Sequence, residues 1–429
     1  MKIKLEKIKT LGLYLLMFIL PWQTRLILKA GDLNNSYWEY GSFSLYLTDI
    51  LLVALIVVAA IGSFKFSQFK SLRLYWCLLA GFEAMIIISV FIAIAWPIAL
   101  YHYIWFILFA GLIWLISSGK YSKEKLFSWF LVGTVFQACL AIIQFFTQQT
   151  WPFKYLGLAS HGSETLGVAV IETVSGRWLR AYGGLGHPNI LGALMAIGVV
   201  MATYLLWKQA NDVFDKTRLK KSLLLWGVLL LNFLALFFSF SRVAWAAGFV
   251  GVMIILIKPL FNKQYFSQAS KILLSLLLFS FILSNSFGAL VAARFDFGNR
   301  LEQKSLSERE TQVYEVKDII NDNFWLGVGL GNYSLALSEV YPDQPAYRYQ
   351  PIHNSPLLIW AETGIIGLVF FVLFFIYLAG TAIRQKDSLK LAIWVMVFMM
   401  LMAEHWPVSL HFGWLMLALI SGIILRRKE

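Results

Sequence analysis

Long apolar runs recur along the whole chain and are separated by short polar connectors. Most of these runs hold about 18 to 25 residues, which is enough for a helix to cross the hydrocarbon core of a bilayer. The predicted spans are residues 11–20, 45–63, 72–94, 98–117, 126–147, 188–207, 222–240, 243–258, 271–292, 356–383, 389–404 and 407–425. The pattern predicts an all-α, polytopic membrane protein with about twelve transmembrane helices in a single membrane domain, residues 1–429.

The connectors alternate in charge, and this alternation predicts how the chain is oriented in the membrane. Basic residues gather in every second connector and at both ends of the chain. They include Lys65, Lys70, Arg73, Lys120, Lys123, Lys125, Lys208, Lys216, Arg218, Lys220, Lys221, Lys258, Lys263, Lys271, Arg384, Lys386, Lys390, Arg426, Arg427 and Lys428. With both termini in the cytoplasm, all of these clusters fall on the cytoplasmic side, as the positive-inside rule requires.

Composition supports a membrane protein and removes one alternative. Of the 429 residues, 59% are hydrophobic and only 14% are charged, whereas a soluble protein has about 25% charged residues. The net charge of +13 could suggest a nucleic-acid partner, but the basic residues lie in membrane connectors, so we expect no nucleic acid. Cys77 and Cys139 lie inside apolar runs, which predicts buried thiols with no disulfide framework and no metal site.

This orientation exposes two long outer loops, residues 148–187 and 293–355. Within the second loop, Ser307 and Glu310 have the spacing of a capping box, which predicts an amphipathic helix at about residues 307–321. One face of this helix would carry four residues spaced for packing against the membrane domain. They are Arg309, Val313, Val316 and Ile320.

Several kinds of site are not supported by the sequence. The cytoplasmic connectors are too short for a nucleotide-binding domain and contain no Walker motif, so no nucleotide cofactor is expected. The outer loops hold no Asp-x-Asp pair and no His/Glu cluster with metal-ligand spacing, so a metal-dependent transferase is not supported. Gly327, Gly329 and Gly331 follow a predicted helix outside the cytosol, so they predict a sharp, close-packed turn rather than a dinucleotide fingerprint.

Three arginines on the outer side are candidates for binding an anion. Arg180 precedes a glycine-rich strip, Arg242 lies in a tight turn between two spans, and Arg309 lies on the predicted outer helix. Guanidinium groups facing one cavity would bind the oxygens of a diphosphate and stay charged at any working pH. The alternative for each is an interfacial arginine whose side chain reaches the lipid headgroups.

His353, followed by Asn354, stands at the mouth of the span that begins near Pro356. A histidine there can accept a proton from an attacking hydroxyl group or stabilise a leaving group. The alternative is an interfacial histidine bonded to a loop carbonyl. Glu362 is an intramembrane acid that is either functional or a helix-packing group, and we assign no role to Glu404 and His405.

Taken in order, these elements resemble the O-antigen ligase superfamily, which includes O-antigen ligases, Wzy-type polymerases and bacterial O-oligosaccharyltransferases. The resemblance covers about residues 180–368. The matching residues are Gly186, His187, Pro188, Asn189 and Gly192, then Ser239, Ser241, Arg242 and Ala244, then Arg309, then Gly327, Gly329, Gly331, Asn332 and Tyr333, and finally His353, Asn354, Leu357, Glu362, Gly364, Gly367 and Leu368.

The resemblance implies a GT-C-like helical fold and an inverting, metal-independent glycosyl transfer from undecaprenyl diphosphate on the outer face of a bacterial inner membrane. Arg180 and Arg242 would bind the diphosphate as catalytic residues, with Arg309 as a further phosphate contact. His353 would assist the acceptor hydroxyl group. Asn189 and Asn354, from the same motifs, complete the expected substrate-binding set, and membrane lipids are the remaining partners.

The sequence leaves the branch of the superfamily open. A ligase would pass the glycan to lipid A–core, and we prefer this reading over a Wzy-type polymerase that extends a lipid-linked chain. A flippase or exporter of lipid-linked oligosaccharides would use the same arginines during transit, but it would need polar residues along several spans. A purely structural envelope partner would not explain why the motif residues gather on one side.

Overall fold

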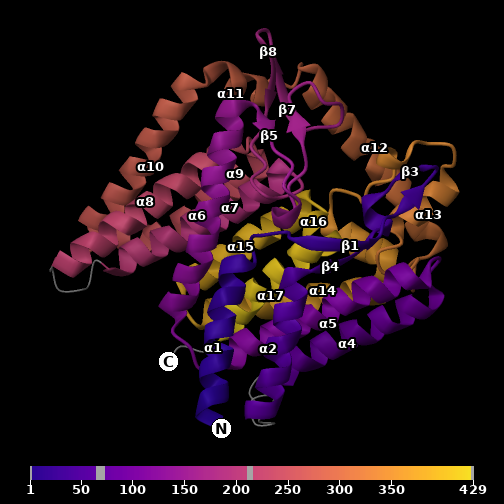
Figure 1. Cartoon of the computed structure of the whole chain (residues 1–429), viewed down its shortest axis with the longest axis horizontal. Coiled ribbons are helices and arrows are strands. Elements are labelled where there is room, and N and C mark those ends of the chain that lie inside the picture. Colours follow the sequence, from indigo (N-terminus) through magenta and orange to yellow (C-terminus); the bar gives the residue numbers. More distant parts are fainter. Residues whose placement is uncertain (1, 64–72, 210–215, 427–429) are drawn as a thin grey trace.

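A computed structural model describes residues 2–63, 73–209 and 216–426 (Figure 1). The connector residues Lys65 and Lys70 and the terminal Arg427 and Lys428 lie outside the described residues. The helices are α1 (Lys2–Ile19), α2 (Leu47–Ser63), α4 (Arg73–Ile92), α5 (Trp96–Ser118), α6 (Lys123–Thr147), α7 (Pro188–Lys208), α8 (Lys216–Phe238), α9 (Arg242–Leu260), α10 (Phe266–Ser286), α11 (Gly288–Phe295), α12 (Arg300–Asp322), α13 (Tyr333–Val340), α14 (Ser355–Arg384), α15 (Ser388–Ala403), α16 (Trp406–Ser409) and α17 (His411–Leu425).

The fold is mostly helical, but it is not purely all-α as the sequence predicted. The described residues contain four small two-stranded antiparallel sheets. Their strands are β1 (Arg25–Lys29) with β4 (Phe43–Tyr46), β2 (Asp32–Leu33) with β3 (Ser36–Tyr37), β5 (Gln149–Thr150) with β6 (His161–Gly162), and β7 (Val170–Thr173) with β8 (Gly176–Leu179). The strands are two to five residues long, too short for hydrophobic alternation to reveal them.

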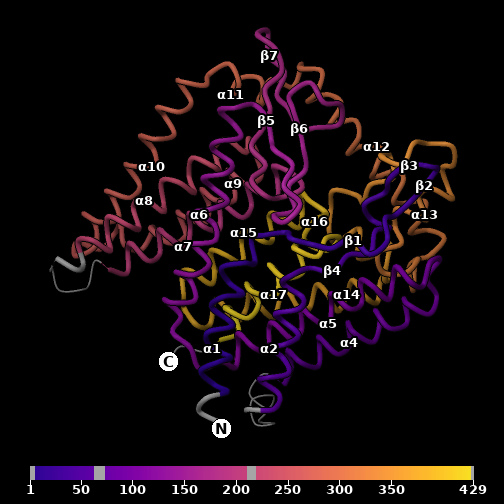
Figure 2. Tube along the Cα trace, viewed as in Figure 1, coloured from indigo at the N-terminus to yellow at the C-terminus, as the bar shows by residue number. Residues whose placement is uncertain are grey.

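Two helices form the centre of the bundle. Nearly every residue of α7 and α17 is buried, because other helices pack around them. Helix α7 packs on α8 and α9, α17 packs on α5, and α15 packs on α9. Figure 2 shows the C-terminal α17 running through the interior beside segments from the beginning of the chain. Helices that are hydrophobic on all sides are expected at such positions.

The predicted spans all fall on helices. By length and composition, eight of the described helices can cross a membrane: α4, α5, α6, α7, α8, α9, α10 and α14. Three shorter apolar helices, at residues 47–61, 388–403 and 411–425, account for further predicted spans. A multi-pass membrane protein is therefore confirmed, whereas the count of twelve crossings and the GT-C likeness stay predictions.

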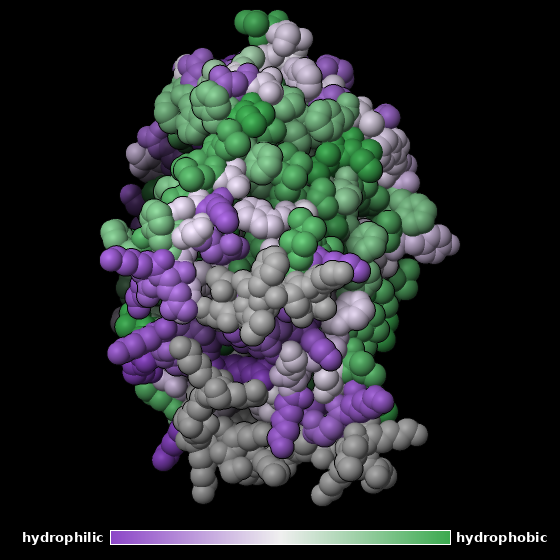
Figure 3. All heavy atoms as spheres, turned by 90° about the vertical axis from the view of Figure 1, so that its left-hand side faces the viewer, coloured by the Kyte–Doolittle hydropathy of each residue, from purple (hydrophilic) through white to green (hydrophobic). Residues whose placement is uncertain are grey.

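The two ends of the bundle differ, and we name them by what they carry. The inner end carries the start of α1 and the end of α17. The outer end carries the β7–β8 hairpin and an arch formed by α10, α11 and α12 (Figure 1). Viewed from the left-hand side of Figure 1, hydrophobic side chains cover most of the upper part of the surface and hydrophilic side chains gather along its lower part (Figure 3).

The amphipathic outer helix exists, but its predicted start at Ser307 is wrong. Helix α12 begins at Arg300, where the side chain of Asn299 accepts a hydrogen bond from the amide of Leu301. An asparagine in extended conformation is a strong helix cap, so it takes precedence over the capping-box pattern eight residues later. Val316 and Ile320 are buried as predicted, but Val313 is exposed.

The glycine-spaced turn is sharp and close-packed, as predicted. Gly327, Gly329 and Gly331 all have positive φ, and a Cβ atom at Gly327 would lie 2.4 Å from the backbone of Glu362. The turn runs beside a kink in α14 at Gly364, where φ is 70°. The amide of Gly329 donates to the carbonyl of Glu362 over 3.0 Å, so the turn satisfies backbone groups that the kink leaves without helical partners.

The prediction of buried thiols is wrong. Cys77 and Cys139 are both free and exposed. Each lies on a helix face that points away from the bundle, so in a membrane lipid rather than protein would surround it. An apolar run does not distinguish these two environments.

Candidate functional site

Polar and charged side chains gather at the outer end, where loops enter and leave the helices. Most come from the ends of elements, and Arg309 from the middle of the outer helix α12, because a charged group in the middle of a membrane span would lose its hydration. The residues are Arg180 after β8, Asn189 in the first turn of α7, Arg242 at the start of α9, Arg294 in α11, Glu302 and Arg309 in α12, His353 before α14, and Glu404 after α15. We call this set the outer cluster.

A buried hydrogen-bond chain begins at Arg180, which is only 6% exposed. Its Nε donates to the carbonyl oxygen of Ser239 over 2.8 Å, and a terminal nitrogen donates to Oδ1 of Asn189 over 2.6 Å. The Nδ2 of Asn189 in turn donates to a carboxylate oxygen of Glu404 over 2.7 Å. Burial lowers the pKa of Arg180 to about 9, and the charge of Arg294 acts in the same direction.

The start of α7 is shaped to present Asn189. His187 is the helix cap, and its Nδ1 accepts a hydrogen bond from the amide of Asn189. Pro188 occupies the first turn, where its missing N–H group costs nothing. Because Nδ1 accepts this bond, it carries no proton.

Arg242 belongs to a second buried group centred on Glu302. A terminal nitrogen of Arg242 lies 2.8 Å from a carboxylate oxygen of Glu302, and the other donates to the carbonyl of Arg294 over 3.0 Å. The other carboxylate oxygen of Glu302 pairs with the guanidinium of Arg294. Glu302 is 3% exposed, so this carboxylate holds two arginines from two different helices in fixed positions.

Arg309 lies between the two groups and is the most accessible arginine of the outer cluster. Its guanidinium is 3.9 Å from the carboxylate of Glu404, and 39% of its side chain is exposed. Glu404 follows the last residue of α15, outside the span. Burial raises the pKa of Glu404 to about 7, against the lowering effect of Arg309 and Arg180.

His353 faces the same region. Both its backbone N–H group and its ring Nδ1 lie within 3.1 Å of Oε1 of Gln312 in α12. Because an amide oxygen can only accept, Nδ1 carries the proton and Nε2 keeps its lone pair. Burial lowers the pKa of His353 to about 4, and the charge of Arg309 lowers it further. The imidazole is therefore neutral near pH 7 and can accept a proton at Nε2.

Two predicted residues have structural partners elsewhere. The Oδ1 of Asn354 accepts a hydrogen bond from the amide of Leu357, which makes Asn354 the cap of α14, and its Nδ2 donates to the carbonyl of Met402. The carboxyl group of Glu362 contacts the backbone amides of Gly331 and Tyr333. The structure therefore places Glu362 beneath the glycine turn, where it supports packing, and not in the outer cluster.

The structure places Arg180, Asn189, Arg242, Arg309 and His353, the candidates from the sequence, in one region, and it adds Arg294, Glu302 and Glu404. Their roles stay predictions. The sequence signals for Arg294, Glu302 and Glu404 were weak. Glu302 lay ahead of the wrongly placed helix start, and Arg294 followed the end of a predicted span. Glu404 was visible as a polar break at the end of an apolar run, a position at which an acid deserved a functional hypothesis.

The charges of the outer cluster do not balance. Four arginines stand against two glutamates, which leaves an excess of two positive charges on fixed guanidinium groups. Such an arrangement is suited to a ligand with two negative charges. Within the described residues, no group of three or more His, Cys, Asp or Glu side chains could hold a metal ion.

An apolar cavity of about 320 Å³ adjoins the outer cluster, between α7, α8, α9, α10 and α11. Trp245 and Phe295 line it. Trp245 lies one helical turn from Arg242, and Phe295 directly follows Arg294. At α9 and α11 the apolar cavity is therefore lined by residues that neighbour two arginines of the outer cluster along the chain.

A comparison with protein families confirms the resemblance. Residues 227–372 match the model of the O-antigen ligase family. This part of the chain is similar to the domain that the family shares. It contains Arg242, Arg294, Glu302, Arg309 and His353. The chain is thus similar to the O-antigen ligase family over about a third of its length, and the remaining residues of the outer cluster come from outside the matched region.

A short match to a transport protein also exists. Over 97 residues the chain is 33% identical to riboflavin transporter RibJ of Trypanosoma cruzi (strain CL Brener). The match covers 22% of this chain and 20% of that protein. Because the chain spans only about a fifth of that relative, the match says nothing about a shared activity.

Proposed function

We propose that this O-antigen ligase-family protein is an inverting glycosyltransferase that moves a glycan from undecaprenyl diphosphate to an acceptor hydroxyl group, with lipid A–core as the preferred acceptor. The reaction takes place at the outer cluster, which faces the periplasm of a bacterial inner membrane, and it needs no metal or nucleotide. The observation that carries the proposal is the junction between the outer cluster and the apolar cavity. A lipid diphosphate has the same two parts in the same order.

The arginines would hold the diphosphate. Arg180 and Arg242 are positioned by Asn189 and Glu302 before any ligand arrives, so little ordering is lost on binding. Fixed cations stabilise the charge that grows on the diphosphate as the bond to the sugar breaks. Arg309, which is more exposed, would close on the outer phosphate oxygens. The first isoprene units would occupy the cavity beside Trp245.

The chemical step then balances without a cofactor. The acceptor oxygen attacks the anomeric carbon and forms the new glycosidic bond. The bond from that carbon to the diphosphate oxygen breaks, and its electron pair leaves with the diphosphate. The proton of the acceptor hydroxyl group passes to Nε2 of His353, whose Nδ1–H group is held by Gln312. Attack opposite the leaving group inverts the configuration.

The test is a product analysis. The protein is reconstituted in nanodiscs with an undecaprenyl-diphosphate oligosaccharide, and lipid A–core is supplied in one sample and left out of another. Mass spectrometry then follows the glycan. The proposal predicts glycan on lipid A–core, together with an equal amount of free undecaprenyl diphosphate.

Each other outcome has a defined meaning. Longer lipid-linked glycans that form with or without lipid A–core would identify a Wzy-type polymerase, and the acceptor part of the proposal would fail. An intact donor that crosses the bilayer of a proteoliposome without release of undecaprenyl diphosphate would identify an exporter, and the enzymatic proposal itself would fail.

A further inference from the structure

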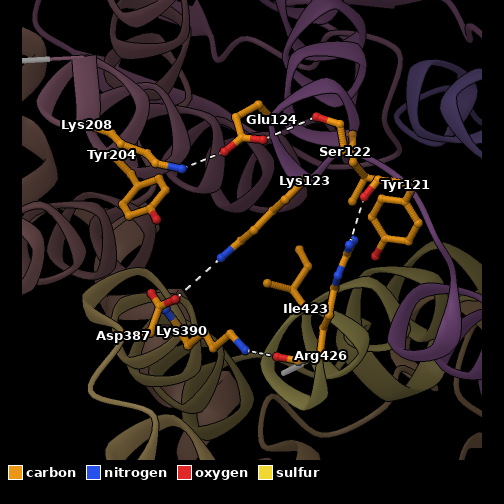
Figure 4. A pocket seen from close by; sticks show the side chains of 11 residues that line it. Tyr121, Ser122, Lys123, Glu124, Tyr204, Lys208, Asp387, Lys390, Ile423 and Arg426 are labelled. Atoms are coloured by element: carbon orange, nitrogen blue, oxygen red, sulfur yellow. Dashed lines mark hydrogen bonds and ion pairs between the residues drawn. The ribbon is translucent and has the colours of Figure 1, made fainter. Parts of the chain in front are cut away.

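A second charged cavity lies at the inner end of the bundle, away from the outer cluster. Its volume is about 490 Å³, within the range of about 300–1,000 Å³ usual for small-molecule sites. The cavity lies where the first turn of α6 meets the ends of α7 and α17 and the start of α15 (Figure 4). We call it the inner pocket.

Basic side chains predominate in the inner pocket. Lys123, Lys208, Lys390 and Arg426 line it, against the acids Glu124 and Asp387. The excess is two positive charges. The first turn of α6 adds to it, because the amide groups at a helix start carry partial positive charge.

The two acids of the inner pocket already have partners, so they would repel an anionic ligand only weakly. Lys208 lies 2.5 Å from Glu124 at the exposed rim. Asp387 caps α15 by accepting from the amides of Leu389 and Lys390, and Lys123 lies 3.4 Å from its other oxygen. Asp387 therefore keeps backbone partners even when Lys123 turns away.

The two most buried cations shape the floor of the inner pocket. The ammonium group of Lys390 donates to the carbonyl oxygen of Ile424 over 3.0 Å, so it caps the end of α17. The guanidinium of Arg426 stacks on the ring of Tyr121 at 3.9 Å and donates to the carbonyl of Tyr121. These contacts explain how the helix ends are joined. They do not explain why a cavity remains between them.

Lys123 is the group best placed to bind a ligand. Its side chain is 26% exposed, and its ammonium group lies over the ring of Tyr204 at 5.7 Å. The charges of Lys208 and Arg426 both repel it. An anion placed among these three cations would relieve that repulsion, and in Figure 4 all three side chains border the same open space.

We propose that the inner pocket binds a phosphate-bearing dianion through Lys123, Lys208 and Arg426. The ligand is either the phosphate of an anionic membrane lipid or that of a soluble phosphorylated molecule, since both present the same oxygens to the same cations. In the predicted orientation the inner pocket opens toward the cytoplasm. The site does not depend on the proposed transferase reaction.

The position of the inner pocket links it to the other end of the bundle. The outer ends of α7 and α15 are joined by the hydrogen bond from Asn189 to Glu404. Lys208 and Lys390, at the inner ends of the same two helices, line the inner pocket. A dianion bound through Lys208 therefore lies beside the inner end of the helix pair that carries part of the outer cluster.

The test compares Lys123→Gln with Lys125→Gln. Lys125 lies two residues away in α6, is exposed, and does not line the inner pocket, so it is a matched loss of charge. One arm measures the melting temperature in neutral detergent with inorganic phosphate or with sodium chloride at equal ionic strength. The other arm compares the melting temperature in phosphatidylcholine nanodiscs with and without phosphatidic acid. Lys208→Gln serves as a second variant if Lys123→Gln folds poorly.

In at least one arm, the phosphate group is expected to raise the melting temperature of the wild type and of Lys125→Gln by about 3 °C, and that of Lys123→Gln by less than half as much. The arm that responds identifies a soluble or a lipid source. Because the outer arginines are the same in all these proteins, a difference between them reports the inner pocket. Equal shifts in all of them, or no shift in either arm, would overturn the proposal.

Discussion

Arg180 and Arg242 show how tertiary packing decides the partners of a charged residue. Both stand at helix or strand ends and could have been headgroup anchors. Instead, Arg180 is buried and reaches two partners in different directions, and Arg242 shares Glu302 with Arg294. Sequence could single out Arg180 and Arg242 as candidates, because they are isolated charges beside apolar spans. It could not predict Glu302 or Glu404, because the partner of a charge is set by tertiary packing.

The geometry of Arg180 predicts that lysine cannot replace it. A lysine has one ammonium group and cannot bond to the carbonyl of Ser239 and the side chain of Asn189 while also facing a ligand. In Arg180→Lys, kcat/KM for glycan transfer is expected to fall about 100-fold or more, with the folded protein retained on size-exclusion chromatography. Arg300→Lys is the control, because Arg300 is 70% exposed and contacts Glu172. Similar losses in both variants would contradict the role of Arg180.

Glu404 and His353 predict the pH dependence of the reaction. The pKa of Glu404 is raised to about 7, and only its ionised form pairs with Arg309. Transfer is therefore expected to rise with pH through about 7. In Glu404→Gln the rise of the rate near pH 7 is expected to disappear. The remaining rise then lies near pH 4, below which His353 is protonated and cannot accept a proton. A profile of kcat/KM against pH in both proteins checks this, and an unchanged inflection near pH 7 in Glu404→Gln would refute it.

At the scale of elements, apolar pattern predicted the spans well and the irregular segments poorly. Each span is long and uniform, so its signal accumulates over many residues. Single side chains decide the irregular segments. Asn299 moved the start of α12 away from Ser307, and the small hairpins at the outer end were missed because each rests on two to four residue pairs.

The contribution of the kink in α14 to stability can be measured. Gly364 has a φ of 70°, and a Cβ atom there would lie 2.0 Å from the carbonyl oxygen of Trp325. Gly364→Ala is therefore expected to destabilise the protein by about 3 kcal/mol or more. Gly380→Ala in the same helix meets no atom closer than 3.6 Å and is expected to be neutral or stabilising by up to about 1 kcal/mol. Thermal unfolding in detergent compares them, and equal melting temperatures would contradict the proposed constraint.

At the scale of the whole molecule, orientation in the membrane decides which side the outer cluster faces. The basic connectors predict that the inner end is cytoplasmic, and the outer cluster then faces the substrate side. Cysteine labelling tests this in a background in which Cys77 and Cys139 are replaced by serine. Ser175→Cys, in the turn between β7 and β8, is expected to react with an impermeant maleimide in intact spheroplasts. Lys263→Cys, between α9 and α10, is expected to react only after permeabilisation, and the reverse pattern would invert the topology.

The central claim is that the outer cluster breaks the bond between a glycan and a lipid diphosphate without a metal ion. The most direct measurement is a single-turnover assay of undecaprenyl diphosphate release in EDTA, with acceptor present and enzyme in excess over donor. The wild type is compared with Arg242→Ala, His353→Ala and the exposed control Arg300→Ala. The account predicts release by the wild type and by Arg300→Ala, with a loss of about 100-fold or more in the other two. Full release by His353→Ala and Arg242→Ala, or no release by the wild type until a divalent metal is restored, would contradict it.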